Sequence, residues 1–192
     1  EVMRIDGSTS MVGVGTDTPL SPLHIKGTGT GDIVTIETSD DGSVEGPNVA
    51  FIRESTSPAQ WDSLGRIEFI GKNNASTPEK IMYSSIKGQI DSFTDGAESG
   101  TIVMSNMVAG TLRNVLMIKD SEININDDSQ DINFRVESNG ETNMLFVDAG
   151  NDRVGIGTAT PSSTLEVAGK ITSGASRRGL VSKTSADMSY SI

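Results

Sequence analysis

The chain contains no cysteine and only one histidine among its 192 residues. A disulfide framework, a cysteine-ligated zinc or iron–sulfur site and a thiol nucleophile are therefore excluded. Aromatic residues make up 4% of the sequence, and its apolar runs are no longer than four residues, as at 115–118. Because a helix needs about 20 apolar residues to span a bilayer, we expect no membrane insertion.

Positive charge is also scarce, since 15 Lys and Arg stand against 26 Asp and Glu and give a net charge of −11. Such a chain repels phosphate, so we expect no nucleic-acid partner. The Gly13/Gly15 pair does not extend to a dinucleotide fingerprint, because Thr18 stands at the place of the third glycine and no helix follows. We therefore predict no cofactor.

The abundant residues are β-branched. Val and Ile together number 32, against 8 Leu, which favours strands over a helix bundle. Short β-like runs are separated by turn clusters such as Thr94-Asp95-Gly96, and no amphipathic helix is evident. The runs predicted as strands between the chain's ends are 33–37, 49–53, 66–70, 81–86, 101–107, 112–119, 122–125 and 132–136. The sequence thus predicts an all-β chain.

The two ends of the chain carry copies of one segment. Residues 2–27 and 144–169 align without a gap at an offset of 142 residues. Ten positions are identical, namely Asp6/Asp148, Val12/Val154, Gly13/Gly155, Gly15/Gly157, Thr16/Thr158, Thr18/Thr160, Pro19/Pro161, Ser21/Ser163, Leu23/Leu165 and Gly27/Gly169. Self-similarity at a fixed offset indicates one structural unit used twice.

Each copy has the pattern of a β-hairpin followed by a third strand. Alternating apolar residues at 2–5 and a polar turn at 6–8 lead into a strand in which Gly13 and Gly15 flank Val14. One face of that strand lacks side chains, which suits a close backbone approach or a sharp bend. Pro19 then breaks the strand because it has no N–H, and residues 21–25 restart it.

Residues 153–169, RVGIGTATPSSTLEVAG, resemble a motif that is common in phage tail fibres and related trimeric fibre proteins, and so do residues 11–27. Segments 65–71 and 110–118 are similar to such fibres in style. The resemblance implies an elongated homotrimer, with three chains wrapped around a common axis, in an extracellular appendage of a virion. Other virion structural proteins would then be its partners.

Physical reasoning agrees with this expectation. Short Val/Ile-rich strands with few aromatics give a thin apolar stripe, which three chains around an axis bury more easily than one. We therefore predict an all-β, elongated, intertwined homotrimeric fibre of the β-prism or shaft type, with a monomeric β-sandwich as the alternative. Residues 1–28 and 143–170 are predicted as shaft units, 29–142 as a β-rich shaft or knob, and 171–192 as a linker or tail.

The duplicated unit is predicted to form the trimer core. Its apolar residues there are Val12, Val14, Leu23, Ile25, Val154, Ile156, Leu165 and Val167. The glycines that would permit close packing are Gly13, Gly15, Gly155 and Gly157. This assignment predicts a structural protein, with no catalytic or metal-binding residues, that acts as a rigid spacer and in host attachment.

Two other functions remain open. A capsid-decorating, receptor-binding or glycan-binding module would use exposed aromatics, for which Trp61 and Tyr83 are the candidates, with Phe93 nearby in sequence. A tailspike-like enzyme that degrades polysaccharide would need two paired carboxylates. The acidic residues available for it are Glu37, Asp40, Glu54, Asp62, Glu68 and Asp91. Asp127 and Asp128 lie in an acidic loop that lacks the calcium-loop pattern, yet three copies of it could converge on a cation.

Overall fold

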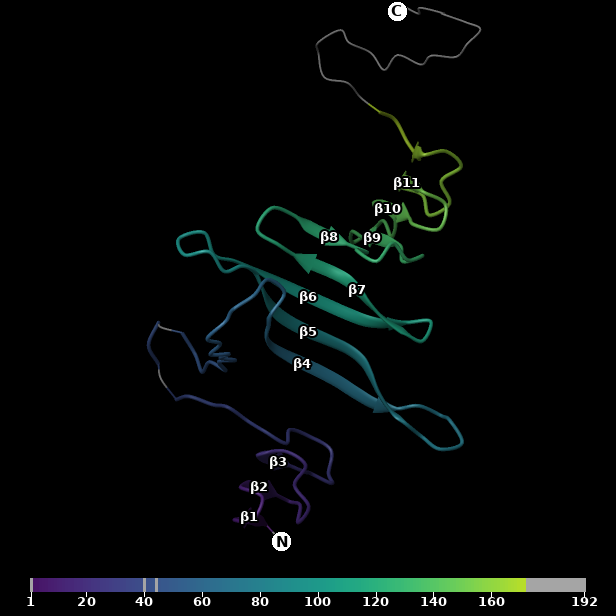
Figure 1. Ribbon diagram of the computed structural model, residues 1–192. Helices are drawn as coiled ribbons and strands as arrows, with labels where there is room; N and C mark the ends of the chain where they lie inside the picture. Colours follow the sequence, from purple (N-terminus) through teal and green to yellow (C-terminus); the bar gives the residue numbers. More distant parts are fainter. Residues whose placement is uncertain (1, 40, 44, 172–192) are drawn as a thin grey trace, which may run out of the picture. The chain divides into compact units, whose positions relative to one another are not determined.

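A computed structural model describes residues 2–39, 41–43 and 45–171 of the chain (Figure 1). These residues form twelve strands and no helix, which confirms the all-β prediction. In the same residues there is no helix with the length and apolarity to cross a membrane. The chain divides into two units, Glu1–Ala50 and Phe51–Ile192. Most of the predicted tail, from residue 172 on, lies outside the described residues.

The first copy of the duplicated segment folds into a three-stranded sheet of β1 (Met3–Asp6), β2 (Met11–Val14) and β3 (Leu23–Ile25). β1 and β2 form the predicted antiparallel hairpin, whereas β3 lies parallel to β2. The β2–β3 connection has only eight residues, although parallel strands usually need a crossover of a dozen or more. The sequence did not lead us to expect this parallel pairing.

The second copy folds in the same way, with β10 (Leu145–Asp148), β11 (Arg153–Ile156) and β12 (Leu165–Val167). In both copies the second strand is hydrogen-bonded to the residue just before the third strand. The N–H groups of Val12 and Val154 donate to the backbone carbonyl of that residue, each at 2.8 Å. Ser10 and Asp152 occupy equivalent left-handed positions, with φ of 56° and 55°. The second copy also has a fourth strand, β9 (Phe134–Val136), paired antiparallel to β10.

In the sequence between the two copies, the chain forms a five-stranded antiparallel meander, drawn from blue to green in Figure 1. It consists of β4 (Ser63–Lys72), β5 (Lys80–Ser92), β6 (Ser99–Val108), β7 (Thr111–Ile118) and β8 (Ile123–Ile125). The two-residue turn between β6 and β7 has positive φ at both Ala109 and Gly110, as a type I′ hairpin requires. β5 has 13 residues, more than twice the length of the run predicted at 81–86.

Two predicted strands do not form. Residues 33–37 and 49–53 are rich in β-branched side chains but lie in irregular, exposed segments. A β-branched run becomes a strand only when a neighbouring strand offers it hydrogen bonds and packing. Among the described residues of this single chain, neither run pairs with a strand of the three sheets, although the side chain of Phe51 lies against Gly65 of β4.

The described residues contain few buried large apolar side chains, namely Val103, Met117 and Phe146. Far more large apolar side chains are exposed, and several of them belong to the three sheets.

Candidate functional site

The five-stranded sheet has one apolar face that is largely open to solvent, although the side chain of Phe51 lies against it at Gly65. Cross-strand pairing places Ile67, Ile86, Met104, Leu116 and Ile125 in one row across all five strands. The next row on the same face contains Gly65, Gly88, Ile102, Ile118 and Ile123. We call these two rows the isoleucine face. Ile67 and Ile102 are each 47% exposed and Ile123 is 68% exposed.

The opposite face of the same sheet is better buried and of mixed character, since it also holds Val103 and Met117, which are 1% and 6% exposed. Ser85, Gln89, Thr101 and Ser105 all retain less than a tenth of their possible exposure there. They alternate with the residues of the isoleucine face along β5 and β6, so they point to the other side. Both faces therefore carry apolar side chains, but those of the isoleucine face are the more exposed. The isoleucine face is therefore incomplete without a covering surface.

A smaller apolar face occurs on the sheet of each duplicated unit. Register pairs Val12 with Leu23 and Val14 with Ile25, and equivalent pairs occur in the second copy. The predicted apolar residues therefore do lie on one face within each copy. Leu23 is 60% exposed, so this face is also uncovered in part. Whether it forms a trimer core stays a prediction.

The glycines of the duplicated unit serve a contact inside the chain. A Cβ built on Gly13 would overlap the carbonyl oxygen of Thr16, and one on Gly155 would overlap that of Thr158. The short crossover between the second and third strands thus passes directly over the glycine. The predicted close approach exists, and it explains how eight residues can connect two parallel strands.

A side chain from the third strand holds each crossover in place. In the first copy, His24 Nδ1 accepts a hydrogen bond from the Leu20 N–H at 3.3 Å, so the histidine is half-buried and engaged. In the second copy, Glu166 Oε2 accepts from both the N–H and the hydroxyl of Ser162, at 2.6 and 2.7 Å. Sequence reasoning aligned His24 with Glu166 but did not identify this shared clamp, because the acceptor group differs.

The Glu166 clamp predicts a local acid sensitivity. Hydrogen bonds from the Ser162 N–H and then its hydroxyl lower the pKa of Glu166 below its ordinary value of 4.5. A depressed carboxyl pKa contributes stability above pH 4.5 that is lost as the pH falls through the folded-state value. We expect the Ser162 amide NMR resonance to titrate in that acid range, and to stay flat in Glu166→Gln, which keeps an acceptor. An identical titration in the variant would contradict the assignment.

Trp61 lies exposed at the start of β4 in a tightly organised loop. Its φ of 71° is left-handed, a conformation that costs a bulky residue about 1–3 kcal/mol. The backbone is held by the Trp61 N–H to the Ile90 carbonyl at 2.8 Å and by an Arg53–Asp62 ion pair of 3.0 Å. Gln60 Nε2 also donates to Asp91 Oδ1 at 3.3 Å. The indole nevertheless remains 53% exposed.

The second aromatic candidate is elsewhere on the sheet. Tyr83 lies in β5 with its ring against Gly71, and is 43% exposed. The N–H of Trp61 donates to the carbonyl of Ile90, which also lies in β5. Ile90 is seven residues, or about 23 Å, from Tyr83 along that strand. The structure therefore does not bring Trp61 and Tyr83 together into one site. Phe93, just beyond β5, is also exposed.

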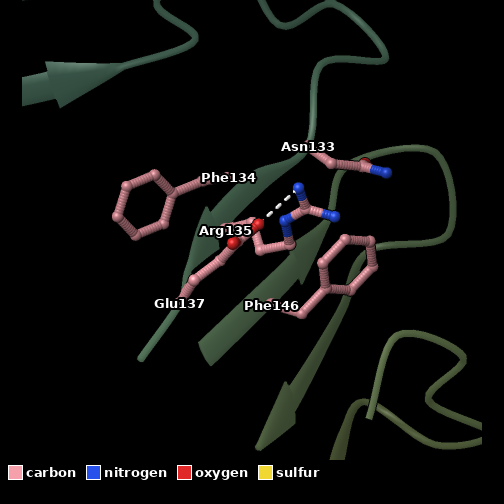
Figure 2. Close-up of a pocket in the computed structure, with 5 residues that line it drawn as sticks. All are labelled: Asn133, Phe134, Arg135, Glu137 and Phe146. Carbon is pink, nitrogen blue, oxygen red and sulfur yellow. Dashed lines mark ion pairs between the residues drawn. The ribbon is translucent and has the colours of Figure 1, made fainter. Parts of the chain in front are cut away.

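A shallow hollow on β9 and β10 is lined by Asn133, Phe134, Arg135, Glu137 and Phe146. Figure 2 shows Arg135 paired with Glu137 and lying beside the ring of Phe146, its cross-strand neighbour, while Phe134 points away. The only charged lining residues are thus an ion pair already satisfied within the chain. Neither this hollow nor its residues were anticipated from the sequence.

Several of the acidic candidates are engaged locally. Asp62 pairs with Arg53, and Glu68 pairs with Arg66 at 3.3 Å. In the acidic loop, Asp127 accepts from the side chain of Asn124, and Asp128 accepts from a backbone N–H of β7. Among the described residues, no three His, Asp or Glu side chains gather as metal ligands would. Asp40 lies outside that part of the chain.

Comparison with known proteins gives no match: no protein-family model matches the chain, and no curated protein resembles it significantly. The site therefore has to be interpreted from its own chemistry. Its most distinctive elements are the isoleucine face and the strained, exposed Trp61.

Proposed function

We propose that this protein is a structural subunit of a fibre-like appendage of a phage virion, in which three copies of the chain associate as a rigid spacer. The observation that carries the proposal is the isoleucine face, because an exposed apolar surface of this extent is typical of an association site. The repeated unit at both ends, with its own partly uncovered face, supports the same interpretation.

Burial of these faces would supply the stability that the single chain lacks. Each buried Ile or Val side chain contributes about 1.5–3 kcal/mol relative to an exposed one. The described part of one chain buries only three large apolar side chains, so association adds to a small private core. A closed cyclic arrangement satisfies every copy equally, as closed homo-oligomers generally do.

The mass of the protein in solution tests the proposal. Light scattering during size-exclusion chromatography at micromolar concentration should give about 61 kDa, three times the chain mass of 20.2 kDa. The mass should persist on dilution through the nanomolar range if the faces are buried. A species of 20 kDa would reject association, and with it the fibre function.

Trp61 favours a second candidate function, attachment to a host surface glycan. An indole face stacks on the apolar face of a sugar ring, while carboxylates and amides such as Asp91 and Gln60 bind hydroxyls. A residue needed only for its backbone would be glycine or asparagine at a φ of 71°. The choice of tryptophan therefore points to a role for its side chain.

An array of bacterial capsular and lipopolysaccharide glycans tests this second function. We expect Trp61→Ala to weaken binding of any captured glycan at least tenfold while leaving the mass of the protein unchanged. Tyr83→Ala is the matched control, because Tyr83 is an exposed aromatic residue of β5, about 23 Å along that strand from the point where Trp61 bonds to it. Equal losses in the two variants, or capture of no glycan, would argue against a site at Trp61.

A further inference from the structure

We propose that copies of this chain meet principally through the isoleucine face of β4–β8, rather than through the duplicated units at its ends. This inference rests on the proposed self-association and specifies the surface that performs it. The sequence had pointed to the duplicated units, whose partly uncovered faces span sheets of only three or four short strands.

The extent of the sheet matches what a stable interface needs. The five strands have 10, 13, 10, 8 and 3 residues, and at about 3.3 Å per residue and about 4.8 Å between strands they give a face of about 700 Å². A standard protein interface buries about 800 Å² on each partner. The rows through Ile67 and Ile102 lie in the middle, and the row on one side of them contains Ser84, Asn106 and Arg113 together with Phe69. An apolar centre with a more polar border is the usual anatomy of an interface.

Charge favours a second copy of the chain as the occupant. Each copy carries a net charge of −11, so copies repel one another at most surfaces. The two rows of the isoleucine face contain no charged or polar side chain, whereas Arg66, Glu68 and Lys87 all point to the opposite side. Contact through these two rows therefore brings none of their side chains into the interface as an unpaired charge.

The rest of the chain agrees with self-association. A foreign partner would need to cover the isoleucine face and also the apolar faces of the two duplicated units. A second copy in parallel offers matching apolar faces in the same order along the chain.

The absence of native cysteine allows a direct test by thiol protection in the full-length protein. Ile102→Cys places a thiol on the isoleucine face, and Glu68→Cys places one on the opposite face, where Glu68 is exposed. Leu165→Cys reports on the second duplicated unit. Ile118→Cys repeats the first measurement on β7. Each variant is labelled with a maleimide, natively and unfolded, after its mass has been checked.

We expect the thiols at Ile102 and Ile118 to label about 100-fold more slowly than the thiol at Glu68 in the associated protein, because labelling would require dissociation. All variants should label equally fast when unfolded. Fast labelling at both Ile102 and Ile118 in a protein of about 61 kDa, with protection at Leu165, would overturn this inference but leave the proposed function standing. A wild-type mass of 20 kDa would instead remove the proposed function itself.

Discussion

Gly15→Ala is expected to open the first duplicated unit, whereas the equivalent Gly157→Ala is expected to have a milder effect. Both glycines have a left-handed φ, 71° and 72°, which costs an alanine about 1–2 kcal/mol. At Gly15 the added Cβ would also overlap the carbonyl oxygen of Lys26, whereas at Gly157 the nearest atoms are 3.5 Å away. Overpacking of backbone adds about 1–3 kcal/mol, so Gly15→Ala should cost about 3 kcal/mol in local stability.

Hydrogen exchange measured by mass spectrometry is the appropriate readout, because the sheets can open independently of one another. Peptides that cover β2 and β3 should lose about 100-fold of their protection in Gly15→Ala, while those of β11 and β12 stay unchanged. Gly7→Ala is the control within the same unit, since a Cβ there meets nothing within 4 Å. Equal effects of Gly15→Ala and Gly157→Ala would show that the contact with Lys26 does not matter.

Much of the local structure could be predicted from the sequence. The repeat with an offset of 142 residues identified two units of equal fold, and the turn at 6–8 indicated the β1–β2 hairpin. The alternation of Gly13 and Gly15 with Val14 predicted a close approach, which the structure assigns to the crossover above Gly13. These features depend on neighbours close in sequence, so periodicity and turn chemistry suffice to find them.

The candidate site could not be assembled in the same way. Alternation predicts that Ile102 and Met104 share a face of β6, but not which residues of β5 and β7 lie beside them. Which residues lie side by side depends on the register of the strand pairing. β-Bulges shift this register between Phe69 and Ile70 and again between Met104 and Ser105. A signal was nevertheless present, because five successive β-like runs each carry a branched or sulfur-containing apolar residue at alternate positions.

Trp61 shows a different limit. Its position beside polar residues suggested a turn, but its left-handed φ depends on bonds to Ile90 in another strand and on the Arg53–Asp62 pair. Sequence propensities assign that conformation to glycine or asparagine, so an aromatic residue there can be found only from coordinates. Residues 33–37 show the reverse case, in which strong β propensity found no partner strand.

Ile102→Asp is expected to abolish association of the protein while leaving its sheets folded. Ile102 is 47% exposed in the single chain, so a carboxylate there can keep much of its hydration when the chain is alone. In the assembly, several copies would each bring one unpaired carboxylate into an apolar interface, at a cost of about 3–5 kcal/mol per buried charge. The mass should therefore fall from about 61 kDa to that of one chain, 20.2 kDa.

Two controls separate this effect from a general change of charge or packing. Ile102→Val preserves an apolar β-branched side chain and should keep the associated mass. Arg66→Asp changes the charge by two units on the opposite face of the sheet, where Arg66 is the cross-strand neighbour of Lys87. This variant should also keep the associated mass. Circular dichroism should show the same β signal in all three variants. A full-size assembly of Ile102→Asp would mean that the isoleucine face stays in water and that the copies are joined elsewhere.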